Sequence, residues 1–247
     1  MGANPLGRPR PRRLSRPPLD APDRTQRARV LVAAGLSLVY WGVVLSFAGH
    51  AVIFPSILLP TPEWIVAGAL LAWAGGGLLS VAGPIACLYV PRESRAAGLI
   101  LTSVVLEIVS LLIGFFAAGA DGDNLPPALE GGLRIAGWLS GLAAIVVFLL
   151  FLRRLGRYLK RSELAYEARW LIVAGLVLAG FVVIVPVILA LTAPVIFFLS
   201  GSEAGGLLLL LPLSVLVYGV LLAAMIYVLI RYLRLLTDLR HALLRDE

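Results

Sequence analysis

The sequence is poor in charge. Only 14% of its 247 residues are Asp, Glu, Lys or Arg, and 60% are hydrophobic. Soluble domains use about 25% charged and about 45–50% apolar residues. The net charge of +7 lies between long hydrophobic runs instead of on a recognisable nucleic-acid-binding motif. The composition therefore predicts a protein embedded in a bilayer, without nucleic acid as a partner.

Cysteine and histidine are also scarce. The single cysteine, Cys87, excludes an intramolecular disulfide and a cysteine metal cage. The two histidines are His50, at the end of the first hydrophobic run, and His241, near the C-terminus. No two runs offer the facing histidines that a membrane haem protein needs, and no HExxH zinc motif occurs. We expect no metal and no cofactor.

Motifs for other chemistry are missing as well. No Walker A motif is present, and the triple glycine 75–77 has neither the preceding strand nor the lysine of a phosphate-binding loop. Ser140 has no histidine at a similar depth to activate it. The acidic residues at 121–123 resemble the start of a calcium loop, but prolines follow where ligands belong. These absences predict a protein without enzymatic activity.

Six hydrophobic runs stand out instead. About 20 apolar residues as a helix cross a hydrocarbon core of about 30 Å, and helices satisfy their own backbone hydrogen bonds in lipid. We predict an all-α, polytopic membrane protein with a disordered Pro/Arg-rich tail over 1–29, a transmembrane domain over 30–230 and a basic amphipathic tail over 231–247. The expected spans are 30–51, 64–90, 96–120, 135–152, 170–191 and 206–230.

The basic residues are distributed unevenly. Of the 21 Lys and Arg residues, only Arg134 falls outside the N-terminal tail, the second and fourth loops and the C-terminal tail. Cytoplasmic loops carry the excess of Lys and Arg. The pattern predicts that both termini are cytoplasmic.

Two hydrophobic stretches are irregular. Residues 51–62 contain Pro55, Pro60 and Pro62, and we expect them to lie at the outer interface. The run that begins at residue 170 continues to residue 199, about 45 Å as a helix, and we expect Pro186 and Pro194 to kink it or end it early. The two stretches together would cap the outer face.

The basic segments 151–170 and 231–247 have charges at helical spacing with apolar residues between them. We expect both to leave the membrane and lie along its surface. One interpretation is that they bind anionic lipid headgroups; the other is that their charges only set topology. The candidate headgroup contacts are Arg153, Arg154, Arg157, Lys160, Arg161, Arg231 and Arg234.

Glu107, in SVVLEIVSLL, is the one formal charge between residues 96 and 120. It lies about 17 Å below the start of its span, near the bilayer midplane, on a stripe with Ser103 and Ser110. The same depth calculation brings Tyr40 and Tyr218 to its level, so we predict a polar network of these five residues. A charge there costs several kcal/mol, and we expect the neutral acid. Its role is either to fasten helices together or to bind and release a proton or cation.

The hairpin ACLYVPRESRAAGLILTSVVLEIVSLLIG, with VVFLLFLRRLGRYL later in the chain, resembles an uncharacterised group of bacterial multi-span membrane proteins. The resemblance covers most of the chain after the tail. It implies a six-span fold in the bacterial inner membrane, and it implies no activity.

Two function hypotheses follow. The first is a non-enzymatic scaffold or assembly component that contacts anionic lipid, another membrane protein or a second copy of itself through its basic segments. The alternative is a small proton-coupled transporter or channel that uses Glu107.

Overall fold

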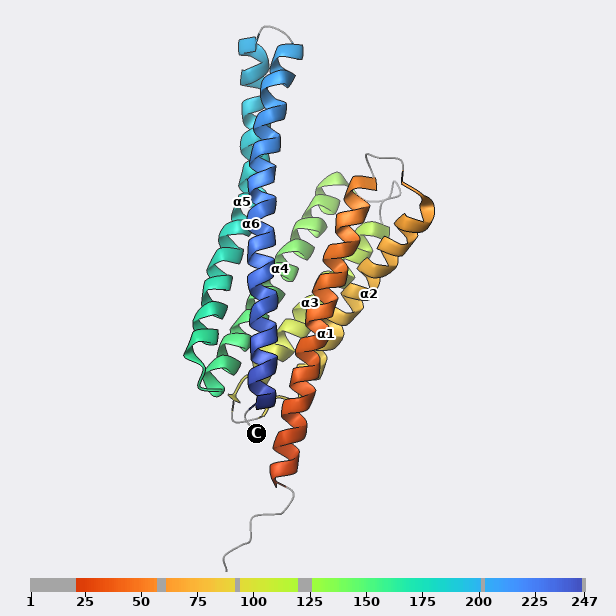
Figure 1. Ribbon diagram of the computed structural model, residues 1–247. Helices are drawn as coiled ribbons and strands as arrows, with labels where there is room; N and C mark the ends of the chain where they lie inside the picture. Colours follow the sequence, from red (N-terminus) through yellow and green to blue (C-terminus); the bar gives the residue numbers. More distant parts are fainter. Residues whose placement is uncertain (1–20, 57–60, 92–93, 120–125, 201–202, 246–247) are drawn as a thin grey trace, which may run out of the picture.

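The computed structural model describes residues 21–56, 61–91, 94–119, 126–200 and 203–245. These residues form six α-helices, each with a stretch long and apolar enough to cross a membrane. The chain is therefore an all-helical, multi-pass membrane protein. The helices, labelled in Figure 1, are α1 (Ala21–Ser56), α2 (Glu63–Cys87), α3 (Ala97–Gly119), α4 (Pro127–Tyr158), α5 (Ser162–Ser200) and α6 (Glu203–Arg245).

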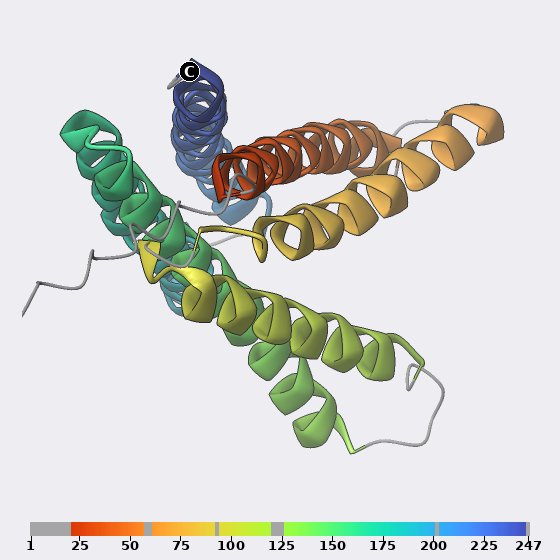
Figure 2. The same cartoon turned by 90° about the horizontal axis from the view of Figure 1, so that it is seen from below.

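The helices are arranged as three antiparallel hairpins. α1 packs on α2, α3 on α4 and α5 on α6, and further contacts join α2 to α3, α4 to α5 and α6 back to α1. Viewed from below in Figure 2, α6 lies beside the start of α1. The chain thus closes into a ring in which helices adjacent in sequence are adjacent in space.

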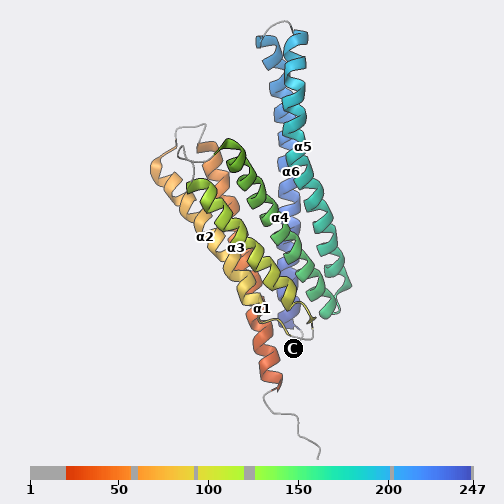
Figure 3. The ribbon, with the colours of Figure 1, turned by 180° about the vertical axis from the view of Figure 1, so that it is seen from behind.

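The hydrophobic core lies near the end of the molecule that holds the C-terminus and the start of α1 (Figure 1). All six helices contribute to it, and its largest fully buried side chain is Phe151. Toward the other end the third hairpin separates from the rest, and its tip extends well beyond the ends of α1 to α4 (Figures 1 and 3). Packing is therefore tight at one end and open at the other.

The prolines do not end their helices. α5 continues through Pro186 and Pro194 to Ser200, and α1 continues through Pro55 to Ser56. In hydrocarbon a broken helix would leave several backbone groups without partners, so retaining the helix costs less than ending it. The expected outer cap is not formed by these two segments, because the tip of α5 stands apart from the end of α1 in both views (Figures 1 and 3). Residues 57–60 lie outside the described residues.

The basic segments also differ from expectation. Residues 151–158 continue α4, a turn with Lys160 at a φ of 56° follows, and α5 begins at Ser162. Residues 231–245 continue α6 without a break. Their apolar side chains, among them Leu155 and Leu239, are buried in the core instead of forming a separate face at a membrane surface.

Part of the predicted disordered tail, 1–29, is helical in the structure. Residues 21–29 form the first turns of α1. The remainder of that tail, residues 1–20, lies outside the described residues.

Candidate functional site

The first hairpin is held by close approach of its backbones. Small residues recur every seven positions on both helices, which keeps them on one face of each. A Cβ atom added to Gly42 would lie 2.9 Å from the carbonyl oxygen of Gly76 and 2.7 Å from the amide nitrogen of Ser80. The other glycines of this seam also come within 3.0 Å of the opposite helix when a Cβ atom is added. The seam consists of Gly35, Gly42 and Gly49 on α1 and Ala69, Gly76 and Gly83 on α2.

The second hairpin is held by hydroxyl groups. Three serines each donate a hydrogen bond to a carbonyl of the opposite helix, and we call them the serine ladder. Such bonds relieve the cost of a polar group in lipid and lock two helices in register. The pairs are Ser103 with the oxygen of Ala144 at 3.0 Å, Ser140 with that of Leu106 at 2.9 Å and Ser110 with that of Gly137 at 2.8 Å.

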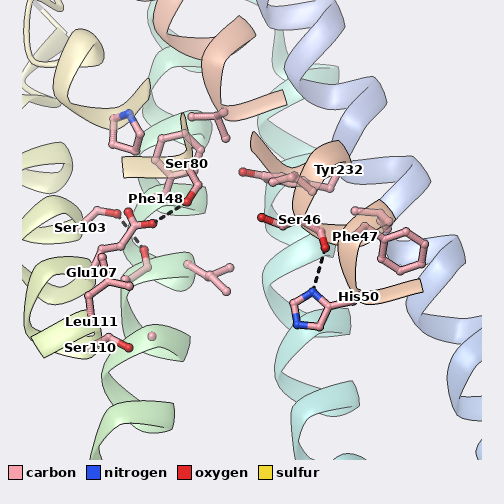
Figure 4. A pocket seen from close by; sticks show the side chains of 17 residues that line it. Ser46, Phe47, His50, Ser80, Ser103, Glu107, Ser110, Leu111, Phe148 and Tyr232 are labelled. Atoms are coloured by element: carbon pink, nitrogen blue, oxygen red, sulfur yellow. Dashed lines mark hydrogen bonds between the residues drawn. The ribbon is translucent and has the colours of Figure 1, made fainter. Parts of the chain in front are cut away.

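A cavity of about 480 Å³ lies between the two hairpins and α6. Glu107 stands on its α3 wall between Ser103 and Ser110, with Ser80 of α2 beside it (Figure 4). Its lining is mostly apolar and includes Phe47, Phe148 and Leu229. The polar lining residues are Ser46, His50, Ser80, Ser103, Glu107, Ser110 and Tyr232.

Glu107 is linked to α2 through one hydroxyl. The Ser80 Oγ lies 3.2 Å from Glu107 Oε1 and 2.8 Å from the carbonyl oxygen of Gly77. A hydroxyl has a single hydrogen to donate. Ser80 can therefore donate to an ionised Glu107, or donate to Gly77 while a protonated Glu107 donates to Ser80.

His50 lines the same cavity from α1 and faces it across from Glu107 (Figure 4). Its Nδ1 lies 2.8 Å from the carbonyl oxygen of Ser46, and its ring meets Trp73 edge-on at 5.9 Å. A carbonyl only accepts, so Nδ1 carries the hydrogen and Nε2 is the acceptor of the neutral ring. The site thus has two proton-accepting groups, His50 on the first hairpin and Glu107 on the second.

Sequence reasoning missed His50 because it placed that residue at the end of a span. The signal that could have found it is its spacing from Ser46 and Val43, which lie four and seven residues before it and so share one face of α1 with it. α1 also continues to Ser56, so His50 lies about 9 Å inside its end.

The predicted network forms only in part. Ser103 and Ser110 line the cavity with Glu107, but Tyr40 and Tyr218 are not among its lining residues. Tyr40 packs against the core and meets Trp41 edge-on, and the side chain of Tyr218 is exposed.

The α6 tyrosine at the level of Glu107 is Tyr232. The depth calculation for Tyr218 assumed that the apolar part of α6 is level with the other spans. Instead the tip of the third hairpin extends beyond them (Figures 1 and 3). A residue fourteen positions later, about 21 Å further along the helix, therefore reaches the cavity.

Two of the candidate headgroup contacts have partners within the protein. The Arg231 guanidinium pairs with Glu167 Oε1 at 3.1 Å and lies 5.1 Å from the ring centre of Trp170 and 5.4 Å from that of Tyr227. Arg154 donates to the carbonyl oxygen of Arg95 at 2.9 Å. Of the others, Arg153 is half-buried, and Arg157, Lys160, Arg161 and Arg234 are exposed.

No protein-family model, curated protein or solved structure matches the chain. The resemblance to a bacterial group therefore stays an expectation from the sequence. Among the residues that the structure describes, no three His, Cys, Asp or Glu side chains lie close enough together to hold a metal ion. The function is argued below from the geometry of the cavity.

Proposed function

We propose that the protein transports protons, or a small solute coupled to protons, across the bacterial inner membrane by protonation and deprotonation of Glu107. The observation that carries this proposal is the cavity of about 480 Å³ at the carboxyl group, within the membrane-spanning helices. A buried carboxyl group that only fastens helices needs a partner and no adjoining space. An intramembrane acid that opens onto a cavity is typical of proton and ion pathways.

The cavity also allows water to solvate the ionised form of Glu107. Water occupies about 30 Å³ in the liquid, so the volume admits several molecules beside Glu107. The Ser80 hydroxyl donates to the ionised carboxylate, and this charge-assisted bond is stronger than its neutral counterpart. Protonation replaces it with a neutral bond and returns the Ser80 hydrogen to Gly77. The hydrogen bond that links α2 to α3 therefore weakens when Glu107 gains a proton and strengthens when Glu107 loses it.

Such a change can move the two hairpins as units. The glycine seam locks α1 to α2, and the serine ladder locks α3 to α4. Glu107 and Ser80 lie at the boundary between them. Rocking of one rigid bundle against another around a central site is a common basis of alternating access.

The orientation proposed for this function is both termini in the cytoplasm. The start of α1, the α4–α5 turn and the end of α6 lie at one end of the molecule (Figure 1). The exposed Arg157, Lys160 and Arg161 lie at this end, as the excess of cytoplasmic Lys and Arg would require.

Proton flux into liposomes tests the proposal. The full chain is reconstituted with a pH-sensitive dye inside, and a potassium gradient with valinomycin supplies the driving force. We expect flux with the wild-type protein, near-complete loss in Glu107→Gln and wild-type flux in Glu63→Gln, which changes an exposed carboxylate at the start of α2. Wild-type flux no higher than in empty liposomes, or equal flux in Glu107→Gln, would overturn the proposal.

A second candidate function is a scaffold that binds anionic lipid, a partner membrane protein or a second copy through its basic end. The supporting observation is a groove of about 420 Å³ lined by Lys160, Arg161, His241 and Arg245, with Glu163 and Asp238 also on its wall. We expect an Arg157/Lys160/Arg161→Gln variant to retain less phosphatidylglycerol through purification in native mass spectrometry, with Arg134→Gln at the opposite end as control. Equal lipid retention and equal oligomeric state in both variants would remove this candidate.

A further inference from the structure

We infer that the cavity binds an amphiphilic organic cation, whose charged group sits at Glu107 and whose apolar groups lie against the aromatic walls. This inference rests on the proposed function and names the substrate class of the same site. The cation would compete with the proton for the carboxylate.

The serines of α2 and α3 that line the cavity with Glu107 present only hydrogen-bond acceptors to a ligand. The hydroxyl hydrogens of Ser103 and Ser110 are donated to carbonyl oxygens of α4, which leaves only lone pairs for a ligand. The Ser80 hydrogen goes to Gly77 or to Glu107 itself. An anionic ligand would find no donor among these three serines, whereas a cation or a protonated amine would find acceptors.

The described lining offers the ionised carboxylate no permanently charged basic partner. No Lys or Arg is among the residues known to line the cavity, and the titratable groups that face Glu107 across it are His50 on α1 and Tyr232 on α6. An ionised group in such surroundings requires a compensating charge or many hydrogen bonds. A bound cation supplies that charge.

The remaining wall selects an organic cation over a metal ion. Ca²⁺ takes six to eight oxygen ligands and Mg²⁺ an octahedral set, but only one carboxylate lines the described cavity. Phe47, Phe148 and Tyr232 supply aromatic rings, which attract organic cations through their π faces. A mostly apolar cavity of a few hundred Å³ with a few polar anchors is typical of sites for small organic molecules.

Equilibrium binding of radiolabelled tetraphenylphosphonium to the purified full chain in nanodiscs tests the inference. We expect saturable binding at alkaline pH, weaker binding in acid as the proton occupies Glu107, and affinity lowered at least about tenfold in Glu107→Gln. Glu63→Gln should bind as the wild type does. Triphenylmethanol, which is also bulky and aromatic but carries no charge, should not displace the label.

The comparison with the neutral competitor uses only the wild-type protein, so it holds even if a variant fails to fold. Absence of saturable binding, displacement by triphenylmethanol, or unchanged affinity in a folded Glu107→Gln variant would overturn the inference. These failures are separable from that of the proposed function. Loss of proton flux in Glu107→Gln without tetraphenylphosphonium binding would overturn only the cation site, whereas cation binding without Glu107-dependent proton flux would overturn only proton transport.

Discussion

The first and second hairpins achieve the same result by opposite means. In α1–α2 the contact depends on missing side chains, because glycines on both helices let one backbone approach the other. In α3–α4 the contact depends on side chains, since serine hydroxyls cross the interface to backbone carbonyls. Lipid provides no hydrophobic driving force between helices, so close van der Waals packing and interhelical hydrogen bonds remain as the two available sources of association. This protein uses one in the first hairpin and the other in the second.

The third hairpin uses neither over most of its length. The glycines of its two helices that the structure describes, Gly175, Gly180 and Gly219, have open space where a Cβ atom would lie. An apolar groove of about 530 Å³ separates its side chains instead. Its polar link is at its base, where Arg231 contacts Glu167, Trp170 and Tyr227. Tolerance to substitution should therefore differ among the hairpins.

Gly42→Leu should have the largest effect. Its side chain would begin 2.7 Å from a backbone nitrogen that cannot move without breaking α2, and overpacking of this kind costs about 3 kcal/mol or more. We expect a large fall in the temperature at which the detergent-solubilised protein loses its monodisperse chromatographic peak. Gly68→Leu is the matched control, because a Cβ atom there meets open space. Equal behaviour of the two variants would show that the glycine seam does not hold the first hairpin.

Loss of the serine ladder should have an intermediate effect. Interhelical hydrogen bonds in membrane proteins contribute about 0.6 kcal/mol on average, so the triple change Ser103/Ser110/Ser140→Ala should lower stability by about 2 kcal/mol. The control is Ser37/Ser214→Ala, whose hydroxyls bond only to their own helices. The same thermal measurement checks this prediction. If the triple variant is as stable as the control, packing alone holds the second hairpin together.

Both means of association leave a periodic pattern in the sequence. Six helices follow from hydrophobic length, because a spanning helix satisfies its own backbone groups whatever its neighbours do. The serine stripe and Glu107 follow from helical periodicity within one element. The heptad spacing of Gly35, Gly42 and Gly49 is equally visible in the sequence, and the matching residues of α2 complete it.

Features that depend on the axial offset between helices cannot be predicted from periodicity within one helix. The sequence predicts Tyr218 at the level of Glu107, whereas Tyr232 lines the cavity with it, because depth along one helix says nothing of its offset from another. The prediction that the ends of α4 and α6 lie along a membrane surface fails for a similar reason. Amphipathic spacing is the same whether the apolar face meets lipid headgroups or, as at Leu155 and Leu239, the core.

Arg231→Gln should have the smallest effect, and it tests the base of the third hairpin. The Arg231 and Glu167 side chains are 40% and 32% exposed, so their ion pair contributes at most about 1 kcal/mol, and the contacts with Trp170 and Tyr227 add about 0.5–1 kcal/mol. We expect a fall of a few degrees in the same thermal measurement, reduced at high salt because screening weakens the wild-type ion pair. Arg234→Gln removes an exposed charge one turn further along α6 and should leave stability unchanged. If the two variants lose equal stability, Arg231 does not hold the base of the hairpin, and the attraction between α5 and α6 has to come from their apolar side chains alone.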